Sequence, residues 1–155
     1  MAQKHLLIVF HSMSGGTQAM VEAVLRGAQH PDISDVEVRV RRAFDAGSED
    51  LVWADGLILG APENFGYMAG AVKDFFDRTF YPMQGRLEGF PYAICIKAGN
   101  DGTGAVNAIR RIAKGFPWRE VHEPVLCVGQ ISDDVLGKCE ELGTAMAAGL
   151  ELGMY

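Results

Sequence analysis

The sequence of 155 residues lacks the features that mark several specialised classes of protein. No apolar run approaches the ~18 residues of a membrane-spanning helix, and no charged start followed by a small-residue cleavage site indicates a signal peptide. Only three cysteines occur, at Cys95, Cys127 and Cys139, and they form no CxxC pair. An odd number of widely spaced cysteines argues against a disulfide framework or a zinc site. We therefore expect a cytoplasmic protein without a membrane partner or a bound metal.

Positive charge is also scarce in this chain. The 14 Lys and Arg residues are outnumbered by 20 Asp and Glu residues, so the net charge is −6. This balance argues against nucleic acid as a partner. Hydrophobic residues make up 48% of the chain, which is enough to form a globular core at this length without metals or disulfides. We expect residues 1–155 to form a single domain.

Short apolar runs alternate with segments of helical spacing along the whole chain. The run HLLIVF at 5–10 has no polar alternation, which is typical of a parallel strand covered on both faces. Regular alternation of strands and helices implies an α/β domain, with a parallel sheet between two helical layers. The expected strands are 5–10, 36–42, 56–61, 90–97 and 121–128, and the expected helices are 17–29, a short helix from Ser48, 68–80, 106–116 and 132–150.

The second expected strand, 36–42, differs from the others. Its valines at every second position alternate with charged residues, which indicates a strand at an exposed edge of the sheet. Five strands with the second at an edge favour the order 2-1-3-4-5. In such sheets a ligand binds outside the carboxyl ends of the strands, here between the first and third strands. The loops that meet there are 11–17, 62–68 and 98–104.

The loop after the first strand combines small and hydroxylated residues but contains no Lys or Arg. Glycines let its backbone turn tightly with N–H groups facing inward, and the following helix N-terminus attracts negative charge. With the Ser and Thr hydroxyls, these groups suit the terminal phosphate of a mononucleotide. A solvated turn with an ordinary helix cap is the alternative. The expected phosphate-binding residues are Ser12, Met13, Ser14, Gly15, Gly16 and Thr17.

Other folds with the same alternation require residues that this chain lacks. There is no GxxxxGK[ST] phosphate loop and no GxGxxG dinucleotide motif after the first strand. A receiver domain would need acidic residues in place of Phe10 and His11, and an aspartate in place of Ala61. A small tyrosine phosphatase would need a cysteine in the first loop, and a hydrolase would need a GxSxG elbow. These absences favour phosphate binding by a mononucleotide site.

Two segments resemble a known family. The pattern Ser12-x-Ser14-Gly15-x-Thr17 is similar to the FMN phosphate loop of flavodoxins. The segment GAPENFGYM, at 60–68, resembles the second flavin loop of the flavodoxin-like NAD(P)H-dependent FMN and quinone reductases, including the WrbA group. The resemblance implies a three-layer flavodoxin-like fold and FMN as the cofactor, with NADPH or NADH as electron donor.

The resemblance also implies a role for each loop toward FMN. The first loop would contact the phosphate, partly through backbone N–H groups. The second would run along the isoalloxazine ring, and the third, which matches the family by position only, would line the pyrimidine and dimethylbenzene side. The implied residues are Pro62, Glu63, Asn64, Phe65, Gly66 and Tyr67 in the second loop, and Ala98, Gly99, Asn100, Asp101 and Gly102 in the third.

The third loop departs from the electron-carrier flavodoxins, which hold the ring between two aromatic residues. Residues 99–104 contain no aromatic, so one ring face would be open to a nicotinamide or quinone, which favours a reductase. The compact chain without an evident nicotinamide site favours the alternative, a one-electron carrier that docks on partner proteins. Nothing in the sequence supports a third possibility, a regulatory module without redox turnover. Homodimers are common among the reductases, so a homodimer is expected by analogy.

Two carboxylates, Glu63 and Asp101, are the acidic groups nearest the expected ring site. A carboxylate that points at the ring would repel the negative charge of reduced flavin by ~1 kcal/mol at about 5 Å. Asp101 would alternatively accept a hydrogen bond from the ring N3–H. Simple exposure of both carboxylates on their loops fits the sequence equally well.

Overall fold

The computed structural model describes residues 2–155, and its elements follow the alternating order expected from the sequence. No helix within this range is both long and apolar enough to cross a bilayer. The strands are β1 (Lys4–Phe10), β2 (Val36–Arg42), β3 (Gly56–Asn64), β4 (Tyr67–Met68), β5 (Pro91–Ala98), β6 (Arg119–Glu120) and β7 (Val125–Val128). The helices are α1 (Gly16–Ala28), α2 (Ser48–Trp53), α3 (Gly70–Met83), α4 (Thr103–Gly115) and α5 (Asp133–Glu151).

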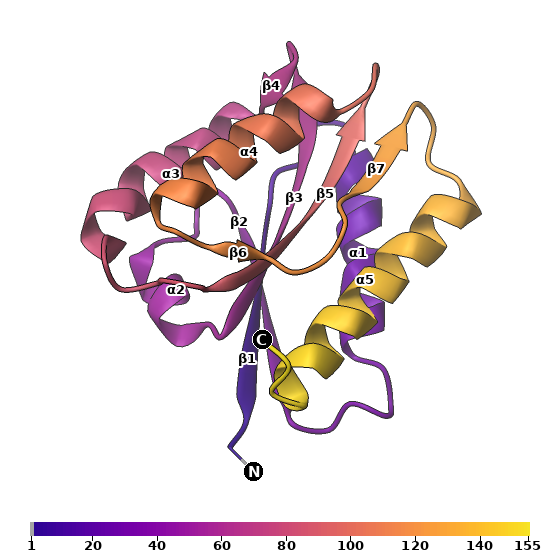
Figure 1. Ribbon diagram of the computed structural model, residues 1–155. Coiled ribbons are helices and arrows are strands. Elements are labelled where there is room, and N and C mark those ends of the chain that lie inside the picture. The colour runs from indigo at the N-terminus through magenta and orange to yellow at the C-terminus, as the bar shows by residue number, and fades with distance from the viewer. Residues whose placement is uncertain (1) are drawn as a thin grey trace.

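The central sheet is parallel, with β2, β1, β3 and β5 side by side. At the far edge, β6 and β7 pair with successive parts of β5. This confirms the predicted order 2-1-3-4-5, because β5 is the fourth strand of the parallel sheet and β6 with β7 forms the fifth. Strand β2 lies at the other edge, as its alternating pattern predicted. Figure 1 shows α1 and α5 on one side of the sheet and α2, α3 and α4 on the other.

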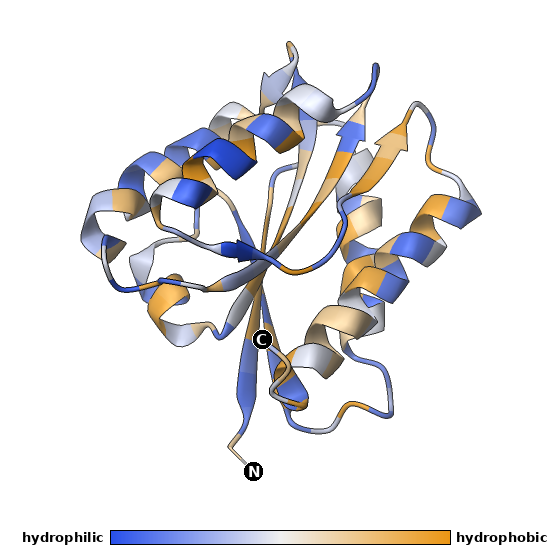
Figure 2. Ribbon diagram, in the orientation of Figure 1, coloured by the Kyte–Doolittle hydropathy of each residue, from blue (hydrophilic) through white to orange (hydrophobic). Residues whose placement is uncertain are grey.

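Each face of the sheet carries its own hydrophobic core. In β1, Leu7 and Val9 belong to the core beneath α3 and α4, whereas Leu6 and Ile8 belong to the core beneath α1 and α5. All four side chains are completely buried, because a strand covered on both faces exposes neither. In Figure 2 the central strands are largely apolar, while hydrophilic residues recur along α4 and α5.

Helix α1 is held against α5 by direct backbone contact. A Cβ on Gly27 would lie 1.8 Å from the carbonyl oxygen of Glu140, and one on Gly143 would lie 1.9 Å from the carbonyl oxygen of Val24. The Thr144 hydroxyl also donates a hydrogen bond to the Gly27 carbonyl at 2.9 Å. Two glycines therefore let the helices approach more closely than side chains would permit, which fixes the position of α1 and of the loop that precedes it.

Two segments differ from the predicted elements. The fifth strand, expected over 121–128, is divided into β6 and β7 around Pro124, which has no N–H to donate to the sheet. The segment 62–68, expected as a loop, extends β3 to Asn64 and returns as β4 in an antiparallel hairpin. The irregularity predicted at Pro124 is confirmed, and the second loop is more regular than its sequence indicated.

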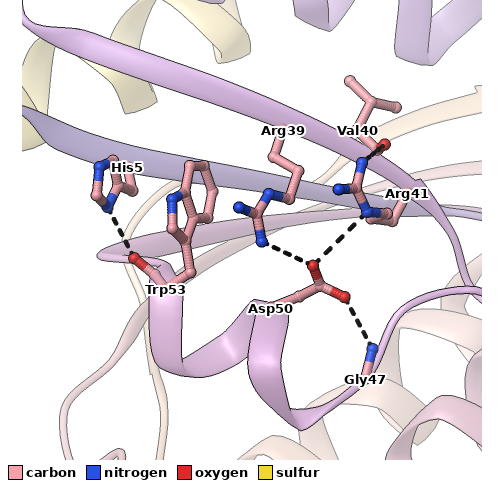
Figure 3. A network of polar contacts seen from close by, with 7 residues as sticks. All are labelled: His5, Arg39, Val40, Arg41, Gly47, Asp50 and Trp53. Atoms are coloured by element: carbon pink, nitrogen blue, oxygen red, sulfur yellow. Dashed lines mark hydrogen bonds and ion pairs between the residues drawn. The ribbon is translucent and has the colours of Figure 1, made fainter.

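A buried carboxylate joins α2 to the edge of the sheet (Figure 3). Asp50, whose side chain is 4% exposed, accepts a hydrogen bond from Arg39 at 2.9 Å and pairs with Arg41 at 3.6 Å. Its other oxygen accepts a hydrogen bond from the backbone N–H of Gly47 at 3.0 Å, just before α2 begins. The Arg39 guanidinium also lies 3.9 Å from the centre of the Trp53 ring. Asp50 therefore caps α2 and forms ion pairs with two arginines of β2.

Replacing Asp50 with Ala should lower the free energy of unfolding by about 2–4 kcal/mol, because the half-buried Arg39 loses its partner and the N-terminus of α2 loses its cap. Urea denaturation measures this. Asp77→Ala, which breaks the exposed pair of Asp77 with Lys73 (2.7 Å), is the matched control and should have a much smaller effect. Equal effects of the two substitutions would contradict the role assigned to Asp50.

Candidate functional site

Three connections lie together at the carboxyl end of the parallel strands, at the top of Figure 1. They are the loop from β1 to α1, the hairpin of β3 and β4, and the loop from β5 to α4. The preceding strands β1, β3 and β5 are direct neighbours in the sheet. The topology therefore gathers in one place all the residues that the sequence analysis expected to hold a cofactor.

The first connection wraps around the start of α1. Gly15 has a left-handed φ of 94°, a conformation that a residue with a side chain rarely adopts. The Ser12 hydroxyl oxygen accepts hydrogen bonds from the backbone N–H groups of Gly15 and Gln18, at 3.1 and 3.3 Å. Ser12 thus supplies the helix cap that Gly15 cannot, and it holds the loop closed.

Donors at the start of α1 have no hydrogen-bond partner among residues 2–155. The backbone N–H groups of Gly16 and Thr17 lie in the first turn, where a helix offers no acceptor, and no other bond reaches them. Thr17 is 2% exposed, and its hydroxyl makes no hydrogen bond within the same range. Unpartnered donors at the positive end of a helix suit an anion, so the first connection fits a phosphate group.

The second connection is a tight β-hairpin. Asn64 pairs with Tyr67, which leaves Phe65 and Gly66 as a two-residue turn. Both have positive φ, 54° and 70°, as a type I′ hairpin turn requires. The left-handed conformation costs a residue with a side chain such as Phe65 about 1–2 kcal/mol. The hairpin therefore places a strained aromatic residue at its tip.

The hairpin is fastened to the N-terminus of α4. The Glu63 carboxylate accepts a hydrogen bond from the backbone N–H of Ala105 at 3.0 Å. The Gly66 carbonyl oxygen lies so close to α4 that a Cβ on Gly104 would be 1.9 Å from it. Glu63 thus compensates the positive end of α4, and the hairpin turn rests directly on the helix backbone.

The third connection, from Ala98 to Gly102, is stabilised by its own carboxylate. Asp101 accepts hydrogen bonds from the hydroxyl and the backbone N–H of Thr103, at 2.8 and 3.0 Å. These two bonds hold the pKa of Asp101 below its usual range, and the bond from the hydroxyl has the larger effect. The carboxylates of Glu63 and Asp101 are therefore both engaged with the first turn of α4.

Large apolar side chains surround this end of the sheet. Phe65 is fully exposed, Met13 is 72% exposed and Tyr67 is 45% exposed. The Asn64 amide donates to the Met13 sulfur at 3.5 Å, which links the first connection to the hairpin. Apolar side chains gathered in solvent are typical of a binding surface, here one formed by two of the three connections.

One cation near the site, Lys97, was not among the predicted residues. It is next to last in β5, and a Cβ on Gly16 would lie 2.3 Å from its Cδ. In the sequence, Lys97 closes the apolar run FPYAICIK and looks like the end of a buried strand. Alternate residues of a strand point to the same face. Since Cys95 packs beneath α1 and α5, Lys97 must also face the side of α1.

The fold and these three connections define a flavodoxin-like protein with a site for a mononucleotide. The family model for NADPH-dependent FMN reductase matches residues 25–133, a range that includes the hairpin and the third connection. The chain therefore belongs to the NADPH-dependent FMN reductase family, within the flavodoxin-like FMN-binding proteins.

The curated relatives include both a flavodoxin and NAD(P)H-dependent quinone dehydrogenases, the two kinds of protein that the sequence suggested. The chain is 32% identical over 104 residues to a flavodoxin of Aquifex aeolicus, covering 67% of this chain and 54% of the relative. It is 34% identical over 105 residues to an NAD(P)H dehydrogenase (quinone) of Acidithiobacillus ferrooxidans, covering 54% and 52%. The chain thus spans about half the length of the curated relatives it matches.

Solved structures share the fold. A flavodoxin from the domain Archaea superposes with a TM-score of 0.82 at 22% identity, covering 95% of this chain and 99% of that one. The apo form of the NADH:FMN oxidoreductase EMOB superposes with a TM-score of 0.75 at 19% identity, covering 96% and 90%. At these identities the likeness concerns the fold alone.

Proposed function

We propose that this chain holds FMN across the three connections and uses it to pass electrons from NADPH or NADH to a quinone, a free flavin or another small acceptor. When bound, FMN supplies the hydride and electron transfer itself. The chain's own residues bind and orient the cofactor and leave room for the second reactant. The observation that carries this proposal is the convergence of unpartnered donors, an ordered hairpin and a loop without aromatic residues at one end of the sheet.

The phosphate end is assigned to the first connection. The N–H groups of Gly16 and Thr17 and the Thr17 hydroxyl have no acceptor within the described range 2–155, whereas the Ser12 oxygen already caps α1. The exposed hydroxyl of Ser14 supplies a further donor at the mouth of the loop. These groups would hold the phosphate without any rearrangement of the helix.

The ring end is assigned to the hairpin and the third connection. Residues 62–67 would run along the ring, and the engagement of Glu63 with α4 keeps its charge away from reduced flavin. Residues 98–102 would line the opposite edge. Since residues 99–104 include no aromatic side chain, one ring face stays open for hydride transfer from a nicotinamide, which favours a reductase.

A one-electron carrier is the second candidate. It is favoured by the relative named flavodoxin, whose match covers 67% of this chain. A carrier would dock on a partner protein through the exposed Met13, Phe65 and Tyr67 rather than admit a nicotinamide.

Anaerobic mixing of the FMN-loaded protein with NADPH, and separately with NADH, distinguishes the two candidates. A reductase should lose its visible flavin absorbance rapidly with at least one nucleotide and regain it when a quinone is added. Absence of bleaching by both nucleotides, with reduction by dithionite in two resolved one-electron steps, would support the carrier instead. The Ser14→Glu variant treated with the same FMN is the control and should give no protein-bound signal.

Two further parts of this proposal concern the oligomeric state and the cellular location of the chain. A homodimer follows by analogy with the reductases, and sedimentation equilibrium tests it. A cytoplasmic location is supported by the cysteines Cys95, Cys127 and Cys139, which are all buried as free thiols.

A further inference from the structure

Lys97 occupies an unusual position for a cation. It is the one residue of β5 that is not fully buried. It shares a face of the strand with Cys95, which lies in the core beneath α1 and α5. Because Lys97 stands at the carboxyl end of β5, its side chain emerges beside the first connection, among the donors assigned to the phosphate.

The Lys97 side chain lies against the first residue of α1. A Cβ on Gly16 would be 2.3 Å from Lys97 Cδ, 2.5 Å from Cε and 3.7 Å from Nζ. The aliphatic stem therefore crosses the backbone of Gly16, and the ammonium group lies next to the helix N-terminus. A side chain at position 16 would meet this stem, whereas Gly16 leaves the stem in its present position.

The positive charges in this arrangement favour the binding of an anion. A helix N-terminus carries a partial positive charge and repels a cation, yet Lys97 lies beside it. Lys73 and Lys138 form ion pairs with carboxylates on their own helices, whereas none of the carboxylates in residues 2–155 pairs with Lys97. The start of α1 thus offers the helix N-terminus and the hydroxyl of buried Thr17, which has no hydrogen-bond partner among residues 2–155. The Lys97 ammonium lies beside it.

We propose that Lys97 binds the terminal phosphate of FMN and gives the site its selectivity for phosphorylated flavin over riboflavin. This inference rests on the proposed function, since it assigns a residue to the same cofactor. The N–H groups of Gly16 and Thr17 and the Lys97 ammonium would together hold the phosphate dianion. Riboflavin ends in a neutral hydroxyl and gains nothing from the lysine, so Lys97 discriminates between two ligands with identical rings.

The test compares both flavins on one variant. Lys97→Met keeps the aliphatic stem against Gly16 but removes the charge. Quenching of flavin fluorescence gives the Kd of FMN and of riboflavin for wild type and variant, at low and high salt. We expect FMN binding to weaken about 10-fold and riboflavin binding to change less than twofold. The salt dependence of FMN binding should also decrease. Lys114→Met, at the far exposed end of α4, is the matched control and should leave both Kd values unchanged.

Two results would overturn the assignment of Lys97. Equal weakening of FMN and riboflavin would mean that the lysine only supports the loop. Unchanged FMN binding by Lys97→Met would mean that the ammonium does not reach the phosphate. If wild-type protein binds riboflavin and FMN with the same affinity, the phosphate site itself is wrong. If it binds neither flavin, the proposed function fails as a whole, which is a different outcome from a failure confined to the lysine.

Discussion

Replacing Ser14 with Glu should weaken FMN binding by at least about 100-fold while the protein stays folded. Ser14 is exposed, and its side chain makes no hydrogen bond with any of residues 2–155. A carboxylate there would add negative charge at the mouth of the loop assigned to the phosphate. Two like unit charges about 5 Å apart repel by about 3 kcal/mol at an effective dielectric constant of ~20. That energy corresponds to roughly a 100-fold change in Kd. Titration of flavin fluorescence measures it.

The matched control for this prediction is Ser14→Gln, which has the size of Glu without its charge. It should change the Kd of FMN by less than about fivefold, since a neutral side chain repels nothing. Ser12 is left intact because its hydroxyl caps α1. A loss as large with Gln as with Glu would indicate crowding, and an unchanged Kd with Glu would place the phosphate elsewhere.

Replacing Gly104 with Ala should disturb the end of the site that is assigned to the flavin ring. The added Cβ would lie 1.9 Å from the Gly66 carbonyl oxygen, and two backbones cannot separate as easily as two flexible side chains. Overpacking of this kind costs about 1–3 kcal/mol, more than the ~1 kcal/mol that alanine gains over glycine in a helix. We expect the hairpin to move away from α4 and FMN affinity to fall by about tenfold or more.

The matched control for Gly104 is Gly70→Ala, because Gly70 also lies at the start of a helix, α3, but a Cβ there would meet nothing within 4 Å. This variant should bind FMN like the wild type and be no less stable to urea. If Gly104→Ala also retains wild-type affinity, the contact between the hairpin and α4 does not shape the site.

The sheet and its order could be predicted because they depend on local patterns. Continuous apolar runs mark strands covered on both faces, and the alternation in 36–42 marks the edge. The position of the three loops then follows from topology alone. For the same reason the division of the last strand could be anticipated from Pro124, since a residue without an N–H disturbs pairing wherever it falls.

The contacts that join the three connections could not be predicted in this way. Glu63 and Ala105 are 42 residues apart, and nothing local in either segment indicates their bond. The hairpin was missed because its turn is Phe65-Gly66, whereas the usual signal is Asn-Gly or Asp-Gly. Lys97 was missed because the face it occupies depends on the register of the whole strand with its neighbours.

The proposed cofactor site straddles the two hydrophobic cores. The first connection leads into α1, on one side of the sheet, while the hairpin and the third connection lead into α3 and α4, on the other. A flavin held by its phosphate on one side and by its ring on the other would join the two helical layers, which cover opposite faces of the sheet. A ligand that binds only the folded state also stabilises that state, by an amount that rises with the logarithm of the ligand concentration above its Kd. The resistance of this chain to proteolysis would then follow the FMN content of the cell, and its abundance would report on flavin supply.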